Sequence, residues 1–283
     1  MLKAGYIYTL KVDRKSDIGY MLRDEDNNEV LLHFQETKKE LNKGEDVKVF
    51  IYFDKKHRLC ATTNTPYVTM NKPGFVRVVE SISNTGVFVS NNTGKDILVS
   101  VDYLPYNLSL WPEVDDTLLV LLKEKRDTLF AKPLNRFEIL DLANDEVKYE
   151  LNQTVEAYIF HISEEGMSLV TRDFKNIFVH KTMFRGTYHM GQLVETKIIH
   201  VKNDNEYNGS LIKQKEAQID PDKDLLINYM KAHNNEMPLD AKSSSDDVEK
   251  IIPLSRKAFK RALGGLYKDG KVTFENGKTY LTK

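Results

Sequence analysis

Aromatic rings that could stack on unpaired bases lie in one short stretch of this 283-residue chain. Residues 155–162 alternate as in a β-strand, so Tyr158 and Phe160 share one face of that strand. The other face carries Ala157 and Ile159, which make the better core pair. We therefore expect Tyr158 and Phe160 to be exposed. Exposed rings stack on bases of any sequence, at about 1–3 kcal/mol per base.

Cations that could hold the phosphates of such a strand follow closely in the sequence. Arg172 and Lys175 belong to a turn, and Phe178 and His180 belong to the next apolar run. Basic side chains track a nucleic-acid backbone while planar groups receive its bases. Phe178 stands between two apolar neighbours, so a core position and an exposed position are equally favoured for its ring.

The C-terminal end concentrates positive charge. The whole chain has 41 Lys and Arg against 42 Asp and Glu, a net charge of −1, which by itself argues against a polyanionic partner. Residues 253–283 contain eight basic and two acidic residues, a net charge of +6. Five of these cations form a candidate phosphate-binding surface: Arg256, Lys257, Lys260, Arg261 and Lys278. A solvated surface without a ligand is the alternative interpretation.

The same end has the pattern of a winged helix. Residues 223–230 have helical periodicity, Asp246 is the expected N-cap of a second helix, and Ser255 that of a third. The third helix carries its apolar residues on one face and most of its cations off that face. Asn276 and Gly277 are the preferred pair for a type I′ hairpin turn. Three helices followed by a hairpin predict a winged helix.

The elements that must position the aromatic stretch repeat along the chain. Three times in the chain, a glycine begins a β-like run, and the last residue of an apolar run follows fourteen positions later. The pairs are Gly19 and His33, Gly86 and Ser100, and Gly166 and His180. The copies are too far apart for a solenoid, so they indicate repeated small domains. Short β-branched and aromatic runs separated by turn residues predict all-β barrels or sandwiches.

Several classes of protein are disfavoured. The single cysteine, Cys60, allows no intramolecular disulfide and fits a small buried hydrophobe. No apolar run approaches the roughly 20 residues that span a bilayer, and no secretory signal begins the chain, so we expect a cytoplasmic protein without a membrane partner. Phosphate-loop, zinc-ligand and nucleophile motifs are missing from the sequence. We expect no enzyme activity, cofactor, metal or small-molecule substrate.

The barrel units resemble the ribosomal S-one-type RNA-binding domain, a five-stranded OB fold. The closest stretch is residues 178–182, followed by residues 190–195. Three such barrels ending in a winged helix resemble the conserved virulence factor B family over essentially the whole chain. The expected architecture is mainly β, with an α+β winged helix at the end. The domains would be OB-fold barrels at 1–63, 64–144 (including a linker) and 145–216, and the winged helix at 217–283.

The resemblance also implies ligand-facing positions. S-one-type domains carry aromatics around the glycine of strand two, a His at the end of strand three, and an Asp and a basic residue near the turn between strands four and five. The matching or replacing residues are His33, Asp54 and Arg58 in the first unit, Phe88 in the second, and His180 and Lys202 in the third. No copy has the full set, which favours divided duties among the barrels or a purely structural role for some of them.

The resemblance implies a non-enzymatic protein that holds single-stranded RNA with low sequence specificity. Its role would be post-transcriptional regulation of gene expression, including virulence factors. Two alternatives remain open. One is a DNA-binding transcriptional regulator that acts through the winged helix, and the other is a protein-docking scaffold on the ribosome or RNA polymerase.

Overall fold

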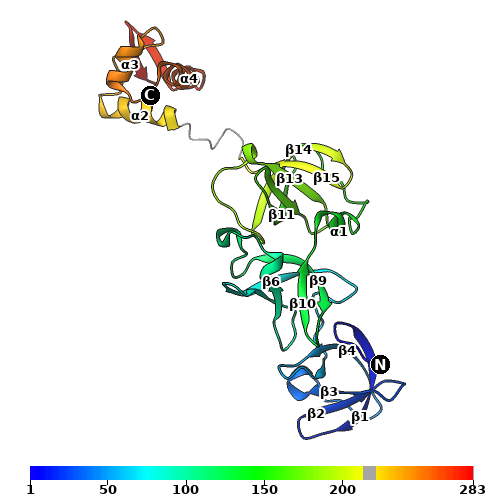
Figure 1. Cartoon of the computed structure of the whole chain (residues 1–283). Coiled ribbons are helices and arrows are strands. Elements are labelled where there is room, and N and C mark those ends of the chain that lie inside the picture. Colours follow the sequence, from blue (N-terminus) through cyan, green and yellow to red (C-terminus); the bar gives the residue numbers. More distant parts are fainter. Residues whose placement is uncertain (213–220, 283) are drawn as a thin grey trace. The chain divides into compact units, whose positions relative to one another are not determined.

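A computed structural model describes residues 1–212 and 221–282, which belong to two compact units, Met1–Ile212 and Lys213–Lys283 (Figure 1). Over the described residues, the larger unit consists of three closed barrels of five strands each. The smaller unit has helices and a three-stranded sheet. The expected mainly β architecture is confirmed. The expected boundary between residues 216 and 217 lies outside the described residues.

The three barrels share one strand order, in which the third and fifth strands run parallel and every other neighbouring pair is antiparallel. The first barrel comprises β1 (Ile7–Lys15), β2 (Gly19–Arg23), β3 (Glu29–His33), β4 (Asp46–Phe53) and β5 (Leu59–Thr62). The second comprises β6 (Gly74–Ile82), β7 (Gly86–Ser90), β8 (Ile97–Ser100), β9 (Thr117–Glu124) and β10 (Leu129–Pro133). The third comprises β11 (Thr154–Ile162), β12 (Gly166–Val170), β13 (Asn176–His180), β14 (Leu193–Asn203) and β15 (Glu206–Ser210).

The fourteen-residue spacing has a geometric cause. Each glycine lies directly opposite its partner on the next strand, as Gly166 does with His180. A Cβ on Gly166 would collide with the carbonyl oxygen of Val179, and its φ of +155° also favours glycine. The partner residue ends the strand and is the N-cap of a 3₁₀ turn. Its side chain accepts a hydrogen bond from the backbone N–H of the residue two positions further on. The repeat therefore marks a tight strand crossing and a cap.

Neighbouring barrels share apolar contacts. Phe50, Tyr52 and Phe53 of the first barrel belong to the same buried cluster as the core of the second. The second and third barrels enclose a smaller cluster, which includes Leu119, Tyr158 and Ile139. Ile139 comes from α1 (Arg136–Leu140), a short helix between these barrels, which begins with a capping box.

The smaller unit is a winged helix, as predicted. Its elements are α2 (Pro221–Ala232), β16 (Glu236–Met237), α3 (Ser245–Ile251), α4 (Arg256–Lys268), β17 (Val272–Glu275) and β18 (Lys278–Leu281). Ser255 caps α4 by accepting the N–H of Ala258, which confirms that prediction. Asn276 and Gly277 have positive φ, as a type I′ turn requires.

Two details of the winged helix differ from expectation. Ser244, not Asp246, is the N-cap of α3, because its hydroxyl accepts the N–H of Asp247. The two-residue strand β16 pairs with β18 and adds a third strand to the sheet. No helix among the described residues is long and apolar enough to cross a membrane.

Candidate nucleic-acid interface

One row of side chains runs across the outer surface of the third barrel, from strand to strand. Successive strand pairings place its members directly opposite one another: His161, Ser168, Phe178, Asn208 and His200. Their neighbours along the strands, such as Leu169 and Val179, are fully buried in the barrel core. The third-barrel row therefore points outward, because side chains alternate across a strand.

A hollow of about 370 Å³ lies on this surface and brings together three residues predicted from the sequence, Phe178, His180 and Lys202. The ring of Phe178 is half-buried, and the Lys202 ammonium is 6.0 Å from its centroid. Asn208 lines the same hollow, and its Oδ1 is buried without a hydrogen-bond partner among the described residues. The ring can thus meet the base of a nucleotide while the ammonium meets its phosphate.

His180 is exposed, and it also stabilises the local backbone. Its Nδ1 accepts the backbone N–H of Thr182 at 3.3 Å and begins the 3₁₀ turn after β13. His33 does the same in the first barrel by accepting the N–H of Gln35 at 3.2 Å. In each case the neutral ring carries its hydrogen on Nε2, which leaves a donor for a ligand.

The expected exposure of Tyr158 is wrong, and Phe160 is half-buried. Tyr158 is only 9% exposed, because the second barrel covers it with Phe75, whose ring centroid is 5.4 Å away. Arg172, another candidate ligand contact, lies 4.7 Å from the Phe75 centroid and 4.9 Å from that of Tyr158, and donates to the Tyr158 hydroxyl at 2.6 Å. Phe160 packs partly on the same cluster. Strand alternation cannot reveal that a neighbouring domain covers the outer face.

Lys175 was expected to bind phosphate, and the structure contradicts this as well. Its side chain is fully buried, and its ammonium donates to the carbonyl oxygens of Asn144 and Asp204, at 2.6 and 3.0 Å, and to Oδ1 of Asn205 at 2.5 Å. Burial lowers the pKa of Lys175. The residue ties the linker after α1 to the β14–β15 turn, so its charge serves the fold.

The second barrel also has a row of outward-facing side chains, on strands β7 to β10. Its members are Phe88, Leu98, Phe130 and Lys123. Phe88 was predicted from the resemblance, whereas Phe130 was missed, although buried Leu129 and Ala131 on either side could have indicated an outward ring. The exposed ring of Tyr103 stacks on Phe130, with centroids 6.4 Å apart and planes 9° apart.

The first barrel offers charge rather than rings. Asp54 and Arg58, both predicted, form an ion pair of 2.7 Å beside a hollow of about 290 Å³. The N–H and side chain of Arg58 donate to the Asp54 carboxylate and lower its pKa to about 2. The charged side chains that line this hollow are four basic and one acidic: Lys55, Lys56, Arg58 and Asp54 of the first barrel, and Lys95 of the second. It can attract phosphate.

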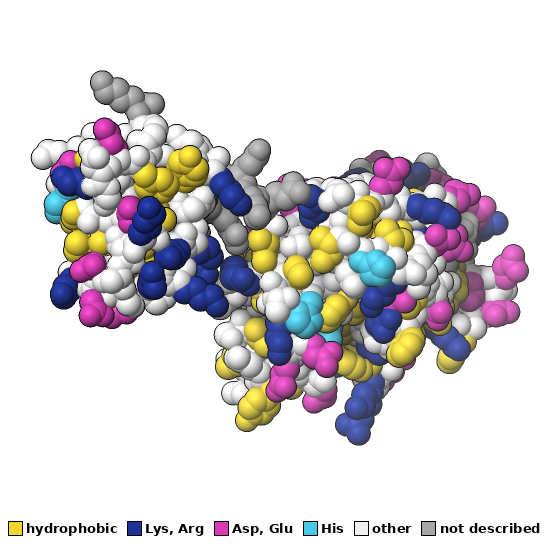
Figure 2. All heavy atoms as spheres, turned by 90° about the horizontal axis from the view of Figure 1, so that it is seen from above, with side chains coloured by type: hydrophobic (Ala, Val, Ile, Leu, Met, Phe, Trp, Pro, Cys, Tyr) yellow, Lys and Arg dark blue, Asp and Glu magenta, His cyan; other side chains and the backbone are white. Residues whose placement is uncertain are grey.

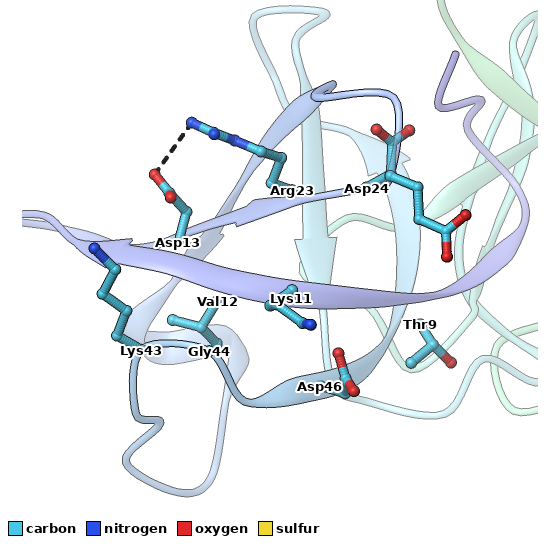
Figure 3. A pocket seen from close by; sticks show the side chains of 10 residues that line it. Thr9, Lys11, Val12, Asp13, Arg23, Asp24, Lys43, Gly44 and Asp46 are labelled. Atoms are coloured by element: carbon cyan, nitrogen blue, oxygen red, sulfur yellow. Dashed lines mark hydrogen bonds and ion pairs between the residues drawn. The ribbon is translucent and has the colours of Figure 1, made fainter.

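A larger hollow on the first barrel, of about 590 Å³, has the opposite character (Figure 3). Its lining includes three basic and four acidic side chains. Arg23 and Asp13, drawn with a dashed line in Figure 3, are paired at 3.3 Å. Because its charges are mixed and partly paired, this hollow is a poor phosphate site.

The winged helix presents part of the predicted basic surface. Arg256, Lys257 and Lys260 are exposed on α4 and have no ion-pair partner among the described residues. Arg261 is paired with Asp222 at 2.6 Å, and Lys278 with Glu236 at 3.3 Å. Figure 2 shows several Lys and Arg side chains close together on the visible face of this unit, at the left.

Tandem S1-like barrels followed by a winged helix define a class of multidomain nucleic-acid-binding architecture, and family comparisons match it. The S1 domain family matches residues 4–64, the "CvfB first S1-like domain" matches 74–132, and the "CvfB-like winged helix domain" matches 224–281.

Full-length relatives extend the match. The chain is 34% identical to the uncharacterized protein YitL of Bacillus subtilis over all of this chain and 95% of that protein. It is 30% identical to conserved virulence factor B of Staphylococcus saprophyticus, over 99% and 94% of the two chains. The chain belongs to the conserved virulence factor B family. A crystal structure of a multidomain protein with nucleic acid binding domains from Streptococcus pneumoniae has a TM-score of 0.65 and 26% identity, over 99% and 98% of the two chains.

Proposed function

We propose that this protein binds single-stranded RNA with low sequence specificity and acts in post-transcriptional regulation of gene expression, including virulence factors. The observation that carries the proposal is the hollow of the third barrel, where Phe178, His180 and Lys202 converge. The family's S1-like domains and a structural neighbour described as having nucleic acid binding domains support nucleic-acid binding. The cytoplasm is the compartment where such regulation acts.

The low specificity follows from the chemistry of the hollow. Every base has a π face, so stacking on Phe178 accepts all four bases. Lys202 binds phosphate as a point charge, which reads no sequence.

The proposal divides the work among domains at 1–63, 64–144, 145–216 and 217–283. The third barrel holds bases, while the basic hollow of the first barrel and Arg256, Lys257 and Lys260 of the winged helix add phosphate contacts. S1-like domains bind rather than catalyse, so we propose a non-enzymatic protein. The exposed cations on α4 favour one alternative, duplex DNA binding through the winged helix.

A competition experiment tests these functions. Labelled single-stranded RNA is bound at low salt and challenged with unlabelled single-stranded RNA, single-stranded DNA or duplex DNA, and the titration is repeated at rising salt. We expect RNA to compete best and affinity to fall with salt. Stronger competition by duplex DNA would favour the DNA-binding regulator. A wild-type protein that binds no RNA at low salt would leave only DNA binding or the protein scaffold.

Paired variants locate the binding. Phe178→Ala with Lys202→Ala should weaken RNA binding at least tenfold, since about 1–3 kcal/mol is lost per stacked base. Tyr106→Ala with Lys72→Ala is the matched control, because both side chains are exposed and neither lines the hollow. Equal affinity of the two double variants would contradict the assignment to the third barrel.

A further inference from the structure

We infer that the second and third barrels form one continuous track for a single RNA strand, with a base-stacking subsite between the barrels. This inference rests on the proposed function and adds a site to it. The subsite is a groove of about 520 Å³, lined by Tyr103 of the second barrel, Phe137 of the linker helix, and Phe160 and Ser168 of the third barrel. We call it the inter-barrel groove.

The groove joins the outward row of the second barrel through stacked rings. Phe88 lies opposite Leu98, and Leu98 is paired with Phe130. Tyr103 stacks on Phe130 and also lines the groove. A strand that lies on the second-barrel row would therefore meet an unbroken apolar and aromatic path into the groove.

The groove joins the third-barrel row through one strand pairing. Ser168 lines the groove, and it is directly opposite Phe178, which lines the hollow. Adjacent side chains on neighbouring strands are about 5 Å apart, less than the distance that one nucleotide spans. Because one residue of this pair lines the groove and the other lines the hollow, consecutive nucleotides can occupy both.

Packing inside the protein does not explain why residue 137 is a phenylalanine. Its side chain is 74% exposed, although it stands on a helix that buries Ile139 fully. The helix is held in place by its capping box, by an ion pair of 2.6 Å between Lys132 and Glu138, and by contact of Arg136 with Glu206. A large ring held in solvent by a fixed helix, at the edge of a groove, suits a base.

The two barrels hold the subsites at fixed spacing. Tyr158 and Val170 pack against Leu119 in the cluster between them, and Arg172 lies over Phe75 of the second barrel. Once the hollow has bound one part of a strand, the groove meets the next part at high effective concentration. Affinity should therefore rise steeply with strand length until the track is full.

Length dependence is the test. Unstructured single-stranded RNA oligomers of about 4 to 16 nucleotides, the range of site sizes known for OB folds, are titrated into the full-length protein. For Tyr103→Ala with Phe137→Ala, we expect the affinity for the longest oligomers to fall about tenfold or more, and that for the shortest to change less than about twofold. Tyr106→Ala, a fully exposed ring outside the groove, should leave both affinities unchanged.

The outcomes separate the two proposals. If the groove variant binds long oligomers as wild type does, while Phe178→Ala still weakens binding, the track is overturned and the third-barrel site remains. If the groove variant loses affinity equally for short and long oligomers, the groove is not a separate subsite and the inference is also overturned. Failure of the wild type to bind any oligomer at low salt would overturn the proposed function as well. Both substituted side chains are exposed, so unchanged melting temperatures confirm intact folding.

Discussion

Ser168 on β12 and Phe178 on β13 lie directly opposite one another on the outer surface of the third barrel, and only Phe178 carries a ring. In the second barrel, the residue two positions after the strand-two glycine is Phe88. We therefore expect Ser168→Phe to add a second stacking surface and to tighten RNA binding about fivefold, or about 1 kcal/mol. Binding titrations with a single oligomer measure this, and an unchanged affinity would show that no base reaches β12.

The glycine of the repeat should be irreplaceable for steric reasons. Gly166→Ala would press a methyl group against the carbonyl of Val179 at a φ of +155°, so we expect the protein to lose at least about 1–3 kcal/mol of stability. Gly264→Ala is the contrast, since this position on α4 is open and helical, and should stabilise the winged helix by about 0.5–1 kcal/mol. Thermal unfolding measures both, and equal effects would refute the steric account.

Lys175→Met should change stability and leave the intrinsic RNA affinity of the folded protein as it is. The substitution keeps the side-chain volume but leaves the oxygens of Asn144, Asp204 and Asn205 without their donor. The expected cost is about 1–3 kcal/mol, as for buried acceptors left without a hydrogen-bond donor. Chemical denaturation gives the stability, and binding is compared at equal folded fraction. A folded variant with weakened binding would restore Lys175 as a ligand contact.

The cations of α4 should contribute through salt-dependent binding. Replacing Arg256, Lys257 and Lys260 by Ala should lower the slope of log affinity against log salt by roughly 2, since each phosphate contact to a single strand contributes about 0.7. Arg261→Ala should lower it by less than the value of about 0.7 expected for one phosphate contact, because its guanidinium is already paired with Asp222. A loss of about 0.7 for this single variant would show that the ion pair does not matter for RNA binding.

Low pH should reduce the stability of the first barrel, because it protonates Glu29. The hydrogen bonds from Arg14, then those from Arg23, lower the pKa of Glu29 from 4.5 to about 2. A lowered pKa means that the ionised carboxylate stabilises the folded state above the unfolded value, and that this contribution is lost as pH falls from about 4.5 towards 2. Glu29→Gln should thus melt below wild type at neutral pH, and the two melting temperatures should converge in acid. A difference that is independent of pH would contradict this.

Much of the architecture could be predicted from local patterns. The spacing between Gly166 and His180 is fixed by one strand pairing, so it can be recognised in the sequence. The Ser255 cap and the Asn276–Gly277 turn each depend on a few adjacent residues. Such features are local, which is why the sequence alone indicates them.

The failed site predictions share a physical cause. Tyr158 has the alternation of an exposed residue, and Lys175 has the composition of a solvated turn, yet distant parts of the chain bury both. The same limitation hid Phe137 and Tyr103, whose interest comes from the groove they line and not from their neighbours in sequence. His180 and Lys202 were found because the resemblance to a known domain marked their positions, whereas Phe178 was found from its place in an apolar run.

The contact of Tyr158 with Phe75 has a practical consequence for work with fragments. A piece of the chain that begins near residue 145 would lose Phe75 and Leu119 and uncover Tyr158 and Val170 to water. Such a piece would bury that apolar surface by self-association. Weak RNA binding by an isolated third barrel would then report a blocked or aggregated sample, and the smallest informative fragment begins before β6.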